Sequence, residues 1–394
     1  MKHMSPESVS HVVADRLRPF GETVFAEFSR LAIEHDAINL GQGFPSFDGP
    51  EFVKEAAIKA IRDGKGQYAP SPGVPELLQA IAARWQASSG ISVDPASNVT
   101  VTSGCTEALM ATFLGLINPG DEVVLFEPYY DSYRACVSMA GAIPRFVTLK
   151  PPSFTFDASD LESAISDRTR AILLNTPHNP TGRVFSREEL ELIADAARDR
   201  DLLVISDEVY EHLVFEGQHL SIAALDGMGE RTVTLSSLGK TFSLTGWKVG
   251  WAIASPELTT AIRRAHQFIT FSVPTPLQYG AVAAMEAPQS YFDSFVSDYR
   301  GRRDILVSGL RKAGFQLESP QGTYFVLADH TAFGFPNDVS FCRHLVTHCG
   351  VVAIPPSAFY ADPADGRTLV RFAFCKDVPM LQEAMSRLES LSAG

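Results

Sequence analysis

The sequence is poor in basic residues and lacks long apolar stretches. Its 394 residues include 33 Lys and Arg against 46 Asp and Glu, a formal net charge of −13, whereas nucleic-acid surfaces need clustered basic residues. No window contains about 18 uncharged apolar residues in succession, and residues 1–10 contain no apolar segment of a signal peptide. We therefore expect no nucleic acid and no membrane among the partners, and a cytoplasmic location.

Cysteine is scarce as well. The 5 cysteines are an odd number, they are widely spread, and they include no C-x-x-C pair. A structural zinc site needs four ligands at closer spacing. The sequence therefore predicts reduced thiols and no metal site.

The composition is otherwise that of a globular protein, with 45% hydrophobic and 20% charged residues. From Asn98 onward, short β-branched runs alternate with helical segments, which favours a mainly parallel sheet with helices on both faces. The strands expected from this pattern are 99–101, 123–126, 145–148, 171–174, 202–205, 233–235 and 249–253.

The segments on either side of this sheet suggest a second unit. Residues 1–47 have only partial periodicity and are expected to form an arm that belongs partly to a smaller domain. Residues 48–285 are expected to form the large domain, beginning with a helix over Glu51–Arg62. Helical and strand patterns over residues 286–394 predict a smaller α+β domain.

One segment, Ser236-Ser-Leu-Gly-Lys240-Thr-Phe-Ser-Leu-Thr-Gly-Trp-Lys248-Val-Gly250, joins two of the predicted strands through small residues. A lysine held at the end of a buried strand loses hydration, which lowers its pKa and makes the amine a nucleophile toward an aldehyde. Lys240 is thus a candidate for Schiff-base chemistry, although strand-end loops often carry a solvated lysine. A phosphate-binding P-loop is excluded because Thr234 stands where its first glycine is required.

Other candidates also follow predicted strands, where ligands of open α/β sheets bind. Gly104, Cys105 and Thr106 open a helix whose amide groups could bind an anion, or could form an ordinary cap. Asp207 follows an apolar strand, so its carboxylate needs a partner unless it caps a helix. Arg371 lies in an apolar strand pattern and is expected to bind a carboxylate, either a substrate's or that of an internal salt bridge.

These segments resemble those of fold-type I pyridoxal-phosphate aminotransferases of class I and II, in the subgroup of kynurenine aminotransferases, glutamine transaminase K and bacterial methionine aminotransferases. The resemblance covers essentially the whole chain, in the family's order. Besides the segment around Lys240, it rests on Asn39-Leu-Gly-Gln-Gly-Phe-Pro45, Asn175-Thr-Pro-His-Asn-Pro-Thr-Gly182, Ser206-Asp-Glu-Val-Tyr210 and Leu369-Val-Arg-Phe372. It implies an aspartate aminotransferase-like fold, with a mainly parallel seven-stranded sheet in a large cofactor-binding domain and a smaller α+β domain.

The resemblance also implies roles for individual residues. Lys240 would hold pyridoxal 5'-phosphate and act as general base and acid, Asp207 would pair with the pyridine nitrogen, and Tyr210 would contact the phenolic oxygen. Further cofactor contacts would come from Gly104, Cys105, Thr106, Asn175, Asn179, Ser237 and Lys248, with Tyr129 stacked on the ring. Tyr68 matches a phosphate contact that the family donates from a neighbouring subunit, which implies a homodimer with a shared site.

The implied substrates are an L-amino acid and a 2-oxo acid, exchanged by a ping-pong mechanism. Arg371 would bind the α-carboxylate, and Gly43 and Asn179 would lie against the substrate. Phe25 and Phe271-Ser272 depart from the kynurenine aminotransferase pattern, which favours a flexible apolar donor such as methionine over kynurenine. Glutamine and aromatic donors remain open.

Three alternatives remain. A β-lyase acting on cysteine S-conjugates would share every catalytic residue. An N-succinyldiaminopimelate aminotransferase would need a second cationic subsite, which the sequence does not locate. A cofactor-binding module fused to a regulator is disfavoured by the acidic charge and by the lack of a DNA-binding pattern before the arm.

Overall fold

The computed structural model describes residues 12–391. The first residues of the expected arm, including the segment inspected for a signal peptide, and residues 392–394 lie outside the described residues. Within the described part, no helix combines the length and apolar character needed to span a bilayer.

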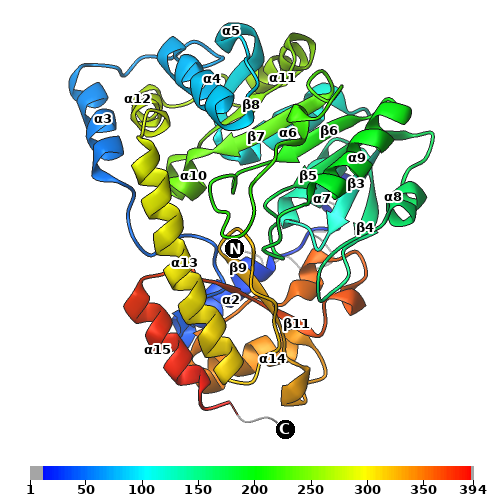
Figure 1. Ribbon diagram of the computed structural model, residues 1–394, viewed down its shortest axis with the longest axis vertical. Coiled ribbons are helices and arrows are strands. Elements are labelled where there is room, and N and C mark those ends of the chain that lie inside the picture. Colours follow the sequence, from blue (N-terminus) through cyan, green and yellow to red (C-terminus); the bar gives the residue numbers. More distant parts are fainter. Residues whose placement is uncertain (1–11, 392–394) are drawn as a thin grey trace.

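The large part of the molecule is built around one twisted sheet (Figure 1). Seven strands of the described chain form it, in the order β2-β8-β7-β6-β5-β3-β4. All neighbours are parallel except β8, which runs antiparallel to both β2 and β7. The strands are β2 (Val99–Ser103), β3 (Glu122–Glu127), β4 (Ile143–Thr148), β5 (Thr169–Asn175), β6 (Leu203–Asp207), β7 (Thr232–Ser237) and β8 (Val249–Ile253). The predicted fold class is confirmed.

The strands are apolar because both faces of the sheet are covered. In β3, Val123 and Leu125 pack against one set of helices, whereas Val124 and Phe126 pack against another. A third core cluster lies over β2 and β8. The covering helices are α3 (Glu51–Arg62), α4 (Pro75–Ser89), α5 (Pro95–Asn98), α6 (Gly104–Leu116), α7 (Asp131–Met139), α8 (Ala158–Ala164), α9 (Arg187–Asp199), α11 (Pro256–Ile269) and α12 (Thr275–Met285).

The lower part of the molecule in Figure 1 combines both ends of the described chain. Strand β1 (Ile38–Asn39) pairs with β10 (Val351–Val352), and β9 (Phe325–Asp329) pairs with β11 (Leu369–Ala373). A single core cluster includes residues from positions 28–40 and from positions 295–388. The helices of this part are α2 (Val24–Glu34), α14 (Asp338–His344), which continues as a π-helical turn to Cys349, and α15 (Val378–Leu388).

Helix α13 (Gln289–Lys312) runs from one part to the other (Figure 1). Phe292, near its start, belongs to the core cluster over β2 and β8, while Phe295 and Tyr299 belong to the cluster of the lower part. Helix α13 therefore contributes to the core clusters of both parts. Helices α2 and α12 were not predicted from the sequence.

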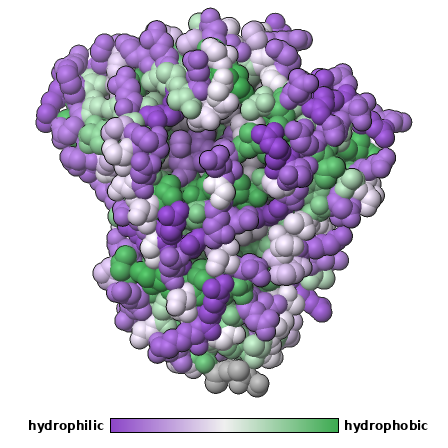
Figure 2. Space-filling model, viewed as in Figure 1, coloured by the Kyte–Doolittle hydropathy of each residue, from purple (hydrophilic) through white to green (hydrophobic). Residues whose placement is uncertain are grey.

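The surface agrees with the acidic composition. On the face in Figure 2, hydrophilic residues cover most of the molecule, and hydrophobic ones gather in patches across its middle.

Candidate active site

A cavity of about 230 Å³ lies at the carboxyl edge of the sheet. Its walls come from the segments that leave β2, β3, β5, β6 and β7 and from the start of β8. The predicted residues among its lining are Gly104, Cys105, Thr106, Asn175, Asn179, Asp207, Tyr210, Ser237, Lys240 and Lys248. Because parallel strands end at the same edge, residues from distant parts of the sequence meet here.

Lys240 lies in a short helix, α10 (Leu238–Thr241), which directly follows β7. Its Nζ donates a hydrogen bond to the Tyr324 hydroxyl at 3.0 Å. The rings of Tyr210 and Tyr324 each lie 5.6 Å from this nitrogen. Burial lowers the pKa of Lys240, because the charged ammonium loses hydration. The amine is therefore closer to its nucleophilic neutral form than a surface lysine is.

Asp207 ends β6 and is 4% exposed. Its Oδ2 accepts a hydrogen bond from the Tyr133 hydroxyl at 2.8 Å, and its Oδ1 accepts one from the amide of Val209 at 3.3 Å. No ion pair involves Asp207 among residues 12–391. Burial raises the pKa of Asp207, and the Tyr133 hydrogen bond opposes that rise. A cation in the cavity would hold this carboxylate ionised.

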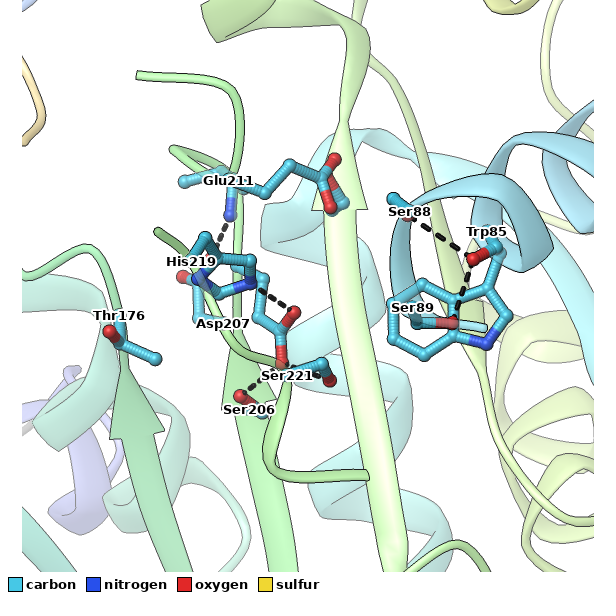
Figure 3. A network of polar contacts seen from close by, with 12 residues as sticks. Trp85, Ser88, Ser89, Thr176, Ser206, Asp207, Glu211, His219 and Ser221 are labelled. Atoms are coloured by element: carbon cyan, nitrogen blue, oxygen red, sulfur yellow. Dashed lines mark hydrogen bonds and ion pairs between the residues drawn. The ribbon is translucent and has the colours of Figure 1, made fainter. Parts of the chain in front are cut away.

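The next residue, Glu208, anchors the turn behind Asp207. It is fully buried, and its Oε1 accepts hydrogen bonds of 2.8 Å from the hydroxyls of Ser206 and Ser221. Its Oε2 lies 2.7 Å from Nε2 of His219. In Figure 3, dashed lines join Ser206, Ser221 and His219 to one carboxylate, which is that of Glu208. A turn held by three side chains fixes the direction in which Asp207 leaves the strand.

Asn175 ends β5, beside Asp207 in the sheet register. Its Nδ2 donates to the backbone carbonyl of Asp207 at 2.8 Å, and its Oδ1 accepts from the amide of Asn179 at 2.7 Å. Both polar atoms of its side chain are thus engaged by the protein. Asn179 has its Oδ1 3.4 Å from Nη1 of Arg371, so its Nδ2 is left to donate into the cavity.

One end of the cavity has the character of an anion site. Gly104, Cys105 and Thr106 form the first turn of α6, whose amide groups and dipole favour negative charge. Nζ of Lys248 lies 3.0 Å from the Thr106 hydroxyl, and Ser237 lines the same region. A Cβ on Gly250 of β8 would lie 2.5 Å from the Gly104 carbonyl carbon and 2.6 Å from the Cys105 nitrogen. Glycine at 250 therefore permits the close approach of β8 to α6.

Arg371 lies in the middle of β11 and is 2% exposed. Its Nη2 donates to the Gly41 carbonyl at 2.9 Å, and its Nε has no hydrogen-bond partner within residues 12–391. It has no ion pair in this part of the chain, so the internal salt bridge considered from the sequence is not formed there. Burial lowers the pKa of Arg371 to about 10, which leaves it charged at neutral pH. A buried charge without a carboxylate partner is costly, which favours a carboxylate ligand.

Aromatic rings surround this guanidinium. The rings of Phe25, Phe325 and Phe359 lie 5.1, 4.3 and 5.1 Å from it. Gly43 packs against Phe325, where an added Cβ would lie 2.5 Å from the ring. The arm, the strand β9 and the turn after β10 therefore form one aromatic wall around Arg371.

Six predicted residues do not line the cavity: Arg371, Phe25 and Gly43, described above, and Tyr129, Tyr68 and Phe271. Tyr129 was expected to stack on a cofactor ring, but it packs against Phe146 at 5.6 Å, and its neighbour Tyr130 lines the cavity instead. Tyr68 and Phe271 lie on the surface, 83% and 45% exposed, with their rings edge to face at 5.4 Å.

Two residues that contact the predicted ones were missed. Tyr133 bonds to Asp207, and Tyr324 bonds to Lys240. The spacing of Tyr130 and Tyr133 on one side of α7 could have indicated Tyr133. No local pattern marks Tyr324, because its relation to Lys240 arises from packing between the two parts of the molecule.

A lysine and a buried carboxylate thus line one cavity at the carboxyl edge of a sheet that has the aspartate aminotransferase-like fold. The structure superposes on an aspartate aminotransferase of Thermus thermophilus with a TM-score of 0.90 and 33% identity, over 96% of this chain and 99% of the other. The chain belongs to the aminotransferase class I and II family, whose family model matches residues 35–388.

Two relatives are more similar in sequence. A probable N-succinyldiaminopimelate aminotransferase of Mycobacterium tuberculosis is 46% identical over 97% of this chain and 99% of its own length. The solved structure of that enzyme from the same species has a TM-score of 0.94, covering 96% of this chain and 100% of the other. A methionine aminotransferase of Escherichia coli is 41% identical over 95% of this chain and 97% of its own length. The predicted enzyme class, an aminotransferase, is confirmed.

Proposed function

We propose that this aminotransferase uses pyridoxal 5'-phosphate to move an amino group from an L-amino acid to a 2-oxo acid by a ping-pong mechanism. The observation that carries the proposal is the meeting of the Lys240 amine and the buried Asp207 carboxylate in one cavity. Both lie within a space whose other end suits an anion.

The residues of the cavity fit this cofactor. The first turn of α6, Ser237 and Lys248 would hold its phosphate, since amide groups and a lysine suit that anion. Asp207 lacks a cation in the described chain, and a protonated ring nitrogen would supply one. We propose Tyr130, in place of Tyr129, as the aromatic side chain beside the ring. When bound, pyridoxal phosphate would act as an electron sink for bonds at the α-carbon of the substrate.

Three side chains of the protein would take part in the proposed reaction. Lys240, with its lowered pKa, would hold the cofactor and, once released, move a proton at the α-carbon. Asp207 would keep the ring nitrogen protonated. Arg371 would hold the α-carboxylate, which orients the bond to be broken relative to the ring.

The wall around Arg371 favours an apolar donor side chain. Phe25, Phe325 and Phe359 surround the proposed carboxylate site, and Lys240 and Lys248 are the cations among the described residues that line the cavity. We therefore propose methionine as the leading donor, with glutamine, aromatic amino acids and kynurenine as further donors. The 46% identity to the mycobacterial relative favours N-succinyldiaminopimelate as the second candidate.

Tyr68 and Phe271 support the proposal of a homodimer. Both are exposed aromatic side chains that do not line the cavity of their own chain, so they are available to a neighbouring subunit. We propose that they complete the cavity of the partner, with Tyr68 at the phosphate end. The five free thiols support a reducing, cytoplasmic location.

An absorbance experiment tests the function. We expect protein loaded with pyridoxal phosphate to show a visible band from the cofactor bound to Lys240, and we expect the preferred donor to convert that band to the amine form. The donors to compare are methionine, glutamine, phenylalanine, kynurenine and N-succinyl-L,L-diaminopimelate. Methionine should give the fastest conversion.

The products separate the alternatives. Release of pyruvate and ammonia from a cysteine S-conjugate, without transfer to a 2-oxo acid, would identify a β-lyase. A protein that gains no band after incubation with pyridoxal phosphate would contradict the proposed function.

Gly250→Ala should weaken cofactor binding. The added methyl group would collide with the backbone of Gly104 and Cys105, which moves β8 away from the anion end. We expect a rise of about 10- to 100-fold in the dissociation constant of pyridoxal phosphate, equal to the loss of about one charge-assisted hydrogen bond. The control is Gly246→Ala, where a Cβ meets nothing within 4 Å. Equal dissociation constants for the two variants would contradict this role of Gly250.

A further inference from the structure

Tyr324 connects the N-terminal arm, at Gly43, with the segment that carries Lys240. It precedes β9, its side chain is fully buried, and its hydroxyl donates a hydrogen bond of 2.5 Å to the carbonyl of Gly43 in the arm. The same hydroxyl oxygen accepts a hydrogen bond of 3.0 Å from Nζ of Lys240. One phenol thus connects the arm with the reactive amine.

The two hydrogen bonds fix each other's direction. A tyrosine hydroxyl has one proton. Tyr324 donates this proton in the hydrogen bond to Gly43, because a carbonyl oxygen can only accept a hydrogen bond. The Tyr324 oxygen is therefore left to accept from Lys240. A neutral amine has two N–H bonds and one lone pair, so directing one N–H at Tyr324 restricts where the lone pair points.

Packing holds the phenol in this place. Its ring meets that of Tyr210 edge to face at 5.2 Å, and it stacks on that of Tyr299 at 6.1 Å. The backbone carbonyl of Tyr324 accepts from the amide of Phe374, close to β11. The hydroxyl is therefore held largely by the lower part of the molecule, whereas Lys240 lies in α10, which follows β7 of the sheet.

We propose that Tyr324 is a positioning residue for Lys240: oriented by the Gly43 carbonyl, it holds the free amine so that the lone pair faces the cavity. The inference rests on the proposed function, in which this amine is released and then moves a proton. Tyr324 also links the N-terminal arm to Lys240. The hydrogen bond to the Gly43 carbonyl orients the Tyr324 hydroxyl, and this hydroxyl is the acceptor for the Lys240 amine. No covalent step is added to the reaction.

Tyr324→Phe tests the inference, with Tyr299→Phe as its matched control. Both variants remove one buried hydroxyl from neighbouring rings, but the Tyr299 hydroxyl has no hydrogen-bond partner among residues 12–391. The first readout uses cofactor-free protein, in which acetylation of Lys240 by acetic anhydride is followed by mass spectrometry against pH. The titratable groups near Lys240 include Asp207, Arg371, Tyr210 and the thiols of Cys105 and Cys375, and neither variant changes them.

Loss of the acceptor destabilises the ammonium, so Tyr324→Phe should lower the midpoint of the acetylation profile by about one pH unit. Tyr299→Phe should leave it unchanged. In the loaded enzyme, Tyr324→Phe should slow the half-reaction with methionine by about 10- to 100-fold with little change in KM. It should also raise the isotope effect of α-deuterated methionine.

The inference would be overturned if Tyr324→Phe and Tyr299→Phe had the same midpoint of the acetylation profile and the same isotope effect. If Tyr324→Phe does not fold, 3-fluorotyrosine at position 324 alone keeps the shape but weakens the acceptor, and the midpoint should again fall. An unchanged midpoint with this residue would also overturn the inference. Acetylation is measured without cofactor, so it tests the role of Tyr324 independently of the proposed function. Failure of the proposed function would instead be seen as a missing visible band.

Discussion

Lys240→Ala should lower the rate of transamination by on the order of 10⁴-fold or more, because the variant loses the group proposed for covalent attachment and for proton transfer. Asp207, Lys248 and the first turn of α6 remain, so the cofactor should still bind without a covalent link. The measurements are the single-turnover rate with methionine and the absorbance of the loaded protein. The visible band should change its position even though cofactor is retained.

Two controls test whether the loss of activity is specific to the Lys240 amine. Lys312→Ala removes an exposed lysine that pairs with Glu389, far from the cavity lining, and should leave the rate unchanged. Ethylamine added to Lys240→Ala should restore part of the activity, since the truncated side chain leaves room for a small amine. Near-wild-type turnover in Lys240→Ala would contradict the mechanism.

Arg371→Lys should raise the KM for amino acids by about 10- to 100-fold, which corresponds to losing one charge-assisted hydrogen bond of about 1.5–3 kcal/mol. Lysine keeps the charge but cannot form two parallel hydrogen bonds to a carboxylate. The same rise is expected for 2-oxo acids, because both substrates carry the carboxylate. The dissociation constant of pyridoxal phosphate should change by less than about twofold, because neither guanidinium contact lies at the anion end.

Arg302→Lys is the matched control for Arg371→Lys. The Arg302 guanidinium also lies against aromatic rings, 4.4 Å from that of Phe47 and 5.3 Å from that of Tyr299. Its Nε likewise lacks a hydrogen-bond partner in the described chain. Arg371 contacts Asn179, which lines the cavity, whereas no hydrogen bond of the described residues joins Arg302 to a lining residue, so replacing Arg302 should leave KM unchanged. Equal losses of cofactor and substrate affinity in Arg371→Lys would indicate a structural role instead.

Much of the site was predictable because its residues follow strands. The ends of β5, β6 and β7 can be located from short apolar runs, and parallel strands place Asn175, Asp207 and Lys240 at a common edge. Alternation of side chains then distinguishes Asp207 from Glu208, which is buried in a separate polar network. These relations depend on local sequence and on one rule of sheet topology.

The missing parts depend on packing between distant segments. Tyr129 and Tyr130 are adjacent and lie beyond the end of β3, so strand alternation cannot decide which ring enters the cavity. The Tyr129 amide bonds to the carbonyl of Phe359, a contact across the molecule that fixes the choice. Helix α12 was missed because apolar residues occur all around it, as is typical of a helix buried by its neighbours.

The hydrogen bond between Arg371 and Gly41 joins residues 330 positions apart. During synthesis, the segments that form the anion end, up to Lys248, emerge well before β11. Chains fold progressively from the N-terminus as they are made. A nascent chain can therefore assemble the anion end of its cavity while β11, with Arg371, is still untranslated, so the proposed carboxylate site is completed last.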